Sequence, residues 1–223
     1  MFCKLLAGAF LLGGLLLPGS NQGAQAAKAT PADWTEYLLK VINTKPDDRL
    51  RDYKAYCEAG ENLFCIDLAA IHLNEIGGKK GEEKAAFYYK KACDMGELNG
   101  CQKLGDMYAF GTGVEPSDTT AFKYYEQACV GGYSLGCVSL GEAYEEGYGV
   151  QVDEAKAFEI YNNSCNHGAE PTCVNLGIMY ELGLSVAQDY SKASGLYKQA
   201  CLGGVGLGCD YWGILKKKGL GSE

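Results

Sequence analysis

Ten of the eleven cysteines fall into five pairs with one constant spacing, and this regularity constrains the fold more than any other feature. The two cysteines of a pair lie eight residues apart, and each pair follows the previous one after thirty-six residues. The pairs are Cys57/Cys65, Cys93/Cys101, Cys129/Cys137, Cys165/Cys173 and Cys201/Cys209. A fixed period of about 20–50 residues is typical of a solenoid of stacked supersecondary units.

Each repeating unit has the pattern of two helices. After the second cysteine of a pair, apolar and small residues recur at helical spacing, as in Cys101, Leu104, Gly105 and Tyr108. This helix ends at 111–113, where glycine accepts a left-handed conformation. A second helix runs from about Ser117 to Cys129, and Gly132 stops it. The same residue types return at the same positions in the other units, so we predict an all-α solenoid of helical hairpins.

The cysteine pairs could form disulfides or bind metal. Zinc ligands usually lie about two to four residues apart in clusters, whereas these cysteines lie eight apart and lack histidine partners. Because one cysteine ends a helix and its partner begins the next across a short turn, the two are within bridging distance. We therefore predict five local disulfides and no metal site. In the chain-entropy model, each disulfide would stabilise the folded state by about 2.6 kcal/mol.

The N-terminus reads as a secretory signal peptide, residues 1–26. Lys4 precedes the apolar run Leu5–Leu17, which is too short for a stable membrane span. Small residues at 24–26 provide a cleavage site, and cleavage after Ala29 is a second option. An uncleaved anchor is the alternative. Cys3 lies before the apolar run, so it is no lipobox cysteine. Export to the periplasm or the medium would place the cysteines in an oxidising compartment.

The rest of the chain divides into a cap and a repeat array. Helical spacing from Trp34 onward predicts a capping helix over residues 30–45, and the five disulfide-stapled repeats follow over 46–223. Trp34 and Trp212 lie near the two ends, and we expect each to be buried under a terminal unit. The formal net charge of -8 and the pI of about 4.9 disfavour binding to nucleic acid or to an anionic membrane surface.

The run 101–114, followed by 121–129, resembles a Sel1-like repeat, a unit related to the TPR. A cysteine pair in every 36-residue unit is similar to the Helicobacter cysteine-rich protein group. The resemblance spans about residues 46–218. It implies a right-handed α/α superhelix with a concave groove, and group members are described as penicillin-binding proteins with weak β-lactamase activity. Two departures are His72 at a tyrosine position and Ser185 at a glycine position.

No known catalytic arrangement is visible. The sequence lacks Ser-x-x-Lys, Ser-Asp-Asn and Lys-Thr-Gly, the three motifs of the common serine β-lactamases. The two histidines, His72 and His167, lie in different units. We interpret His72 as a core substitute for tyrosine and His167 as a cation at a helix C-terminus. Residues 147–149 form a repeat loop rather than a cofactor motif, so we predict neither a catalytic residue nor a cofactor.

One face of the first helix of each unit varies between units, and in helical-repeat solenoids this face lines the groove. Its mixture of polar and apolar groups suits an extended peptide, with Asn175 as a backbone clamp; plain surface variation is the alternative. The candidate groove residues are Asp67, Asn74, Lys103, Asp106, Phe110, Ser139, Glu142, Glu146, Asn175 and Ile178. The sequence thus favours a monomeric interaction module that binds a peptide or protein. A β-lactam-binding protein, or a binder of cell-wall fragments, is the hypothesis that only the resemblance implies.

Overall fold

The computed structural model describes residues 46–221, which form ten α-helices and one π-helical turn. The elements are α3 (Pro46–Glu58), α4 (Asn62–Ile71), η1 (His72–Ile76), α5 (Gly78–Asp94), α6 (Leu98–Phe110), α7 (Asp118–Val130), α8 (Ser134–Glu146), α9 (Glu154–Asn166), α10 (Glu170–Leu182), α11 (Tyr190–Leu202) and α12 (Gly206–Lys217). The all-α repeat fold is confirmed. The predicted signal peptide, the capping helix and Trp34 lie outside the described residues and stay predictions.

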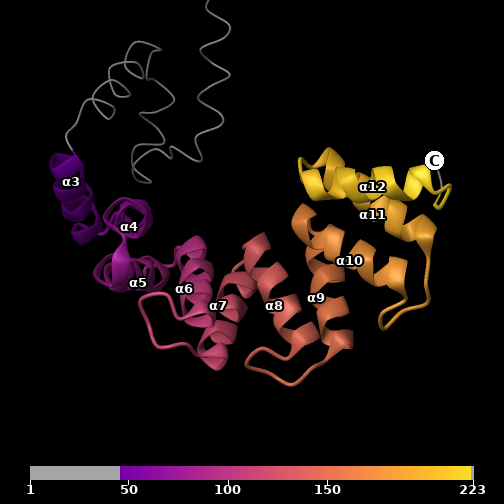
Figure 1. Cartoon of the computed structure of the whole chain (residues 1–223), viewed down its shortest axis with the longest axis horizontal. Helices are drawn as coiled ribbons and strands as arrows, with labels where there is room; N and C mark the ends of the chain where they lie inside the picture. The colour runs from indigo at the N-terminus through magenta and orange to yellow at the C-terminus, as the bar shows by residue number, and fades with distance from the viewer. Residues whose placement is uncertain (1–45, 222–223) are drawn as a thin grey trace, which may run out of the picture.

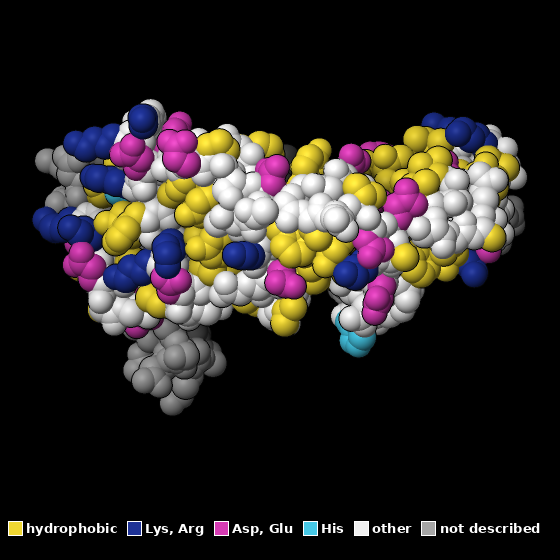
Figure 2. All heavy atoms as spheres, turned by 90° about the horizontal axis from the view of Figure 1, so that it is seen from below, with side chains coloured by type: hydrophobic (Ala, Val, Ile, Leu, Met, Phe, Trp, Pro, Cys, Tyr) yellow, Lys and Arg dark blue, Asp and Glu magenta, His cyan; other side chains and the backbone are white. Residues whose placement is uncertain are grey.

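The helices follow one another along a curved rod whose ends, α3 and α12, lie far apart (Figure 1). Each helix packs against its neighbours in sequence, and α8 also contacts α6 and α10. One face of the rod exposes apolar side chains in several separate places along its length rather than in one patch (Figure 2). Stability of such an array comes from contacts within and between adjacent units, because distant units do not touch.

The structure contains all five predicted disulfides, one at the turn that joins α3 to α4 and one at each equivalent turn as far as α11 to α12. The bonded pairs are Cys57–Cys65, Cys93–Cys101, Cys129–Cys137, Cys165–Cys173 and Cys201–Cys209. The bridged Cα atoms lie between 4.4 and 4.9 Å apart. Each staple therefore fixes the approach of two antiparallel helices at their shared end.

The second cysteine of each pair lies one turn further into its helix than the sequence analysis placed it. We expected Cys65 and its equivalents to begin a helix, yet Cys65 is the fourth residue of α4, which starts at Asn62. The helix begins earlier because the turn after α3 is short, with Gly60 in a left-handed conformation at φ 98°. A position one turn inside α4 directs the sulfur of Cys65 into the core, where both Cys57 and Cys65 are fully buried.

The first and last staples differ in burial. The first bridge, Cys57–Cys65, belongs to the same core cluster as Phe64 and Leu68. In the last bridge Cys201 is half-buried and Cys209 is exposed. No further described unit covers α12, so its disulfide is the one most accessible to solvent in the described part of the chain.

Between the staples, glycines in the middle of α6, α8 and α10 give tyrosine rings room to lie against the helix backbone. The pairs are Gly105/Tyr125, Gly141/Tyr161 and Gly177/Tyr197, each twenty residues apart. A Cβ added at Gly177 would lie 2.5 Å from Cε1 of Tyr197, which is closer than real Cβ atoms approach. The repeated glycine is thus required by close packing of the next helix.

The two departures from the repeat keep its geometry. His72 is buried and stacks on Tyr88 with ring centroids 5.5 Å apart, as Tyr108 stacks on Tyr124 at 5.8 Å. The prediction that this histidine replaces a core tyrosine is confirmed. Ser185 keeps the left-handed backbone of the glycine it replaces, with φ 56°, and its hydroxyl donates to Glu154.

Trp212, in the last helix, is only half-buried, because no further described unit covers α12. The ammonium groups of Lys198 and Lys216 lie 5.5 and 5.7 Å from the centroid of its ring. The burial predicted for this tryptophan is therefore partial, and lysine side chains shield the remaining ring surface.

Candidate ligand-binding groove

A hollow of about 380 Å³ opens where α6, α7 and α8 meet. Four of the predicted groove residues lie in its wall: Asp106 and Phe110 from α6, and Ser139 and Glu142 from α8. Helical spacing placed these side chains on one face, and the packing of α8 beside α6 brings the two faces together. The other lining residues are Ala109, Asp118, Ala121, Tyr125, Ala143 and Tyr148.

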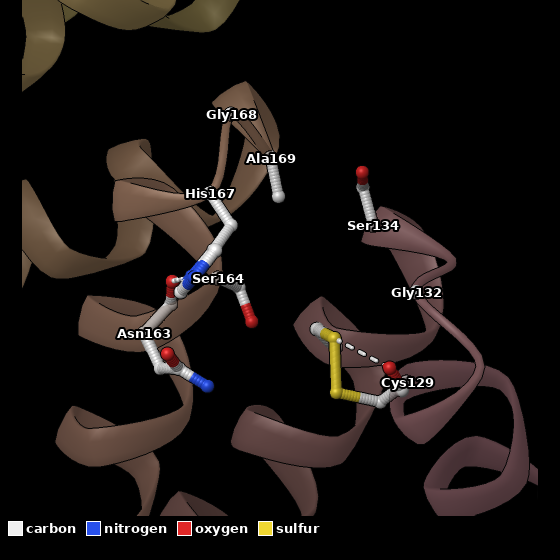
Figure 3. Close-up of a pocket in the computed structure, with 9 residues that line it drawn as sticks. Cys129, Gly132, Ser134, Asn163, Ser164, His167, Gly168 and Ala169 are labelled. Carbon is white, nitrogen blue, oxygen red and sulfur yellow. Dashed lines mark hydrogen bonds between the residues drawn. A yellow bond between two sulfur atoms is a disulfide. The ribbon is translucent and has the colours of Figure 1, made fainter.

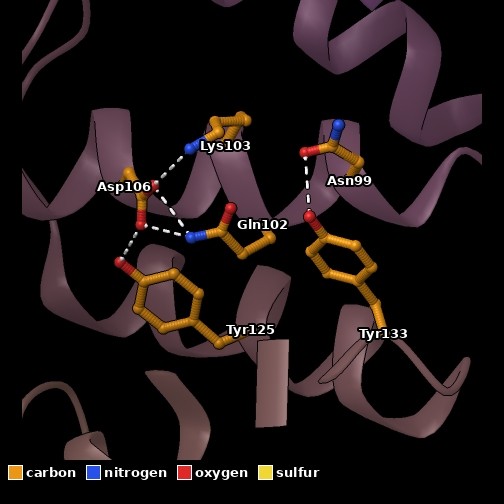
Figure 4. Close-up of polar contacts among 6 residues, drawn as sticks. All are labelled: Asn99, Gln102, Lys103, Asp106, Tyr125 and Tyr133. Carbon is orange, nitrogen blue, oxygen red and sulfur yellow. Dashed lines mark hydrogen bonds and ion pairs between the residues drawn. The ribbon is translucent and has the colours of Figure 1, made fainter. Parts of the chain in front are cut away.

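A polar network holds Asp106 at the edge of the hollow (Figure 4). The amide of Gln102 donates to both carboxylate oxygens, at 2.9 and 2.8 Å, and the hydroxyl of Tyr125 donates to one of them at 3.1 Å. The ammonium group of Lys103 lies 3.7 Å from the same carboxylate. Asp106 is therefore oriented by the fold and partly neutralised.

Tyrosine hydroxyls link the buried rings to carboxylates in the later units as well. Tyr161 donates to Glu145 and Tyr197 donates to Glu181, each at 2.8 Å. Burial raises the pKa of both hydroxyls, and the neighbouring carboxylates raise it further. These tyrosines stay protonated at neutral pH and act as fixed donors.

The carboxylate of Glu142 is left without a tyrosine partner, because Tyr161 donates to Glu145 instead. Although the residue as a whole is exposed, partial burial of its carboxylate raises the pKa of Glu142. The charges of Glu145, Asp106 and Glu146 add to this rise, and a hydrogen bond from Asn175 offsets part of it. Negative charge is thus concentrated along α8.

The remaining predicted groove residues lie outside this hollow. Asp67 and Asn74 are exposed on α4 and η1, and Glu146 is exposed at the end of α8. Ile178, on α10, is half-buried against the C-terminal core rather than free in the groove. The structure therefore brings together the middle of the predicted set and leaves its N-terminal members apart.

Two residues that help to form the hollow, Asp118 and Tyr148, were not among the predicted groove residues. Tyr148 was assigned to a repeat loop, yet its ring is 55% exposed beside the hollow. Variation between units at this loop position could have identified Tyr148, because the equivalent positions hold Thr112 and Leu184. Asp118 begins α7, and Ser117 caps that helix by accepting a hydrogen bond from the backbone of Thr120.

A second hollow, of about 470 Å³, lies between the disulfide turns that precede α8 and α10 (Figure 3). Ser134, Ser164 and His167 line it. Within residues 46–221 the ring of His167 hydrogen-bonds to the carbonyl of Asn163, at 2.8 Å, and to no serine. The histidine holds the end of its own helix and does not activate a hydroxyl in this arrangement.

The other histidine is enclosed in the core. Burial lowers the pKa of His72, with a further contribution from Lys84, and its Nδ1 has no hydrogen-bond partner. Across the part of the chain that the structure describes, no three His, Cys, Asp or Glu side chains lie close enough to hold a metal ion. None of the helices described has the length and apolar character needed to cross a membrane.

The profile of the Sel1 repeat matches residues 63–97, 99–133, 134–168 and 171–205. The chain belongs to the Sel1 repeat family. These proteins generally mediate protein–protein interactions. The matched repeats begin at α4, α6, α8 and α10, so the disulfides Cys93–Cys101, Cys129–Cys137 and Cys165–Cys173 each join one Sel1 repeat to the next. Cys57–Cys65 instead ties α3, which precedes the first matched repeat, to that repeat.

Solved structures agree with this fold. The Sel1 repeat protein from Oxalobacter formigenes is 22% identical, with a TM-score of 0.63 over 82% of this chain and 69% of that one. The c5321 antigen of uropathogenic Escherichia coli is 25% identical, with a TM-score of 0.57 over 81% of this chain and 46% of that one. Cysteine rich protein B of Helicobacter pylori is 31% identical, with a TM-score of 0.46 over 57% and 91%. No curated protein matches the chain in sequence.

Proposed function

We propose that this protein is an exported interaction module that binds an extended segment of a protein partner in the groove between α6 and α8. One observation carries the proposal: side chains at positions that vary between repeats converge on a hollow of about 380 Å³. Phe110, at its rim, is 81% exposed. A large apolar side chain beside oriented polar groups is what a peptide-binding groove offers a ligand.

Export is supported by the five disulfides, because such bonds persist in oxidising compartments. The periplasm or the culture medium would provide these conditions. The signal peptide within residues 1–26 remains a prediction. It is tested by N-terminal sequencing of the protein recovered from periplasmic extract and medium, where a mature chain that begins at Ala27 or Thr30 is expected.

The groove is tested by photo-crosslinking from position 110. A benzoylphenylalanine in place of Phe110 keeps an aromatic ring at the rim of the hollow. The same group in place of Leu202 is the control, since that side chain is 77% exposed at the end of α11, away from the residues that line the hollow. Oxidised protein is irradiated with envelope extract and medium. We expect a discrete crosslinked partner from position 110, absent from position 202 and lost when Glu142→Ala and Asn175→Ala are combined. The same products from both positions would contradict the groove proposal.

The β-lactam hypothesis rests on the resemblance alone. Among residues 46–221 the structure offers no serine activated by a histidine or lysine. Hydrolysis of nitrocefin by purified oxidised protein, in proportion to its concentration and abolished by one substitution in the second hollow such as Ser134→Ala, would replace the interaction proposal with an enzymatic one.

A further inference from the structure

The hollow between α6 and α8 has an aromatic rim that the repeat fold does not require. Phe110 is 81% exposed, and the equivalent positions in the next two units hold Glu146 and Leu182. Tyr148, which also lines the hollow, is 55% exposed, and its equivalents are Thr112 and Leu184. Since other units fold without aromatic residues at these positions, the two rings are available to a ligand.

The wall below the rim has an excess of negative charge. Asp106, Asp118 and Glu142 line it, and in the described part of the chain neither Asp118 nor Glu142 forms an ion pair with a lysine or arginine. Lys103 approaches only Asp106, on the opposite helix. The hollow is therefore complementary to a ligand that carries positive charge.

The shape of the site favours an organic cation over a metal ion. No three acidic or histidine side chains in residues 46–221 converge closely enough for metal binding. The carboxylates instead line a hollow of about 380 Å³ together with the aromatic residues Phe110 and Tyr148. A guanidinium group is planar, accepts bidentate pairing with a carboxylate and stacks on aromatic faces, which an ammonium group does less well.

We propose that this hollow binds an arginine side chain of the extended partner segment, with Glu142 paired to the guanidinium group and Phe110 and Tyr148 flanking it. This inference rests on the proposed function and names the chemistry of its ligand. Asn175, on α10, lies near this carboxylate and lowers the pKa of Glu142.

The test compares three blocked peptides with the same sequence, Gly-Leu-Ser-X-Ser-Leu-Gly, in which X is arginine, norleucine or glutamate. Each is titrated into ¹⁵N-labelled oxidised protein, and amide shifts at Phe110 and along 139–148 report on binding. We expect the arginine peptide to bind about three- to fivefold more tightly than the norleucine peptide, as for a partly exposed ion pair. The glutamate peptide should not shift these amides.

Variants then assign the effect to named groups. Glu142→Gln should remove the preference for arginine and leave the norleucine peptide unaffected, whereas Phe110→Ala should weaken both peptides. Glu159→Gln, at an exposed position on α9, is the matched control and should change neither. Equal affinities for arginine and norleucine would overturn the arginine inference and leave the groove intact. Amide shifts confined to other helices, or the absence of any amide shift, would also overturn the arginine inference. The crosslinking experiment tests the groove proposal separately.

Discussion

The packing of tyrosine rings on glycines predicts opposite effects for one substitution at two equivalent positions. Gly177 and Gly213 occupy the same place in successive units. At Gly177 an added Cβ would lie 2.5 Å from the ring of Tyr197, which is fully buried. At Gly213, in the last helix, nothing lies within 4 Å of an added Cβ. Alanine should therefore destabilise the protein at the first position and stabilise it at the second.

The magnitude at Gly177 follows from the displacement that alanine demands. Ordinary van der Waals contact begins near 3.4 Å, so the ring of Tyr197 must move by almost 1 Å. Overpacking of this kind costs about 1–3 kcal/mol. Moving the ring also weakens the hydrogen bond to Glu181, worth about 1 kcal/mol. Alanine returns about 1 kcal/mol of helix propensity, which leaves a net loss of about 1–3 kcal/mol.

The assay is thermal and urea unfolding of the oxidised protein, followed by circular dichroism. Gly177→Ala should lower the thermal midpoint by about 2–12 °C, and Gly213→Ala should raise it by a few degrees, because only the propensity gain remains. Adding Tyr197→Leu to Gly177→Ala should cost less than the sum of the two single changes. A Gly177→Ala protein as stable as the wild type, or equal losses at both positions, would refute the packing argument.

Two further predictions concern the disulfides and the tyrosines. Limiting reductant should cleave Cys201–Cys209 first and Cys57–Cys65 late, because Cys209 is exposed while both cysteines of the first bridge are fully buried. Differential alkylation with peptide mass spectrometry reports the order of cleavage. Simultaneous loss of all five bridges would contradict the prediction. Because burial and Glu145 raise the pKa of Tyr161 in the folded state, its contribution to stability is complete below the unfolded pKa of about 10 and declines above it by about 1.4 kcal/mol per pH unit. The thermal unfolding midpoint should therefore decrease as the pH rises above about 10, and Tyr161→Phe should make this decrease with pH less steep. An unchanged dependence of the midpoint on pH in Tyr161→Phe would be evidence against a stabilising role of the Tyr161 hydroxyl.

Much of the fold could be predicted because the same residue pattern recurs in each repeat, so each unit gives independent support for the same structure. The constant cysteine spacing predicted the disulfide pairing, and the helix boundaries near Ser117 and Gly111 agree with the caps in the structure. The spacing did not fix where a helix starts relative to its cysteine, so Cys65 lies one turn inside α4 instead of at its beginning. The interpretation of His72 followed from its alignment with tyrosines and is confirmed by its stacking on Tyr88.

The candidate site was only partly predictable, because it depends on contacts between helices. Helical spacing placed Asp106 and Phe110 on one face, but which carboxylate accepts from the tyrosine of the next helix was not assigned. Tyr125 donates to Asp106, whereas Tyr161 donates to Glu145 rather than to Glu142, the equivalent of Asp106. The equivalent of Glu145 in the earlier unit is Ala109, which has no carboxylate, so there the tyrosine donates to Asp106. The structure shows that Glu145 is preferred to Glu142 where both are present.

The position of the disulfides connects this stability to the groove. The hollow is shared by the repeats 99–133 and 134–168, and Cys129–Cys137 bridges these two repeats. In a solenoid each unit is held only by its neighbours, so the covalent bond between α7 and α8 restrains the relative motion of the two repeats at their junction. A groove whose two walls are fixed before binding loses less conformational entropy when a peptide enters. We therefore infer that the Cys129–Cys137 disulfide both stabilises the array and fixes the walls of the proposed groove.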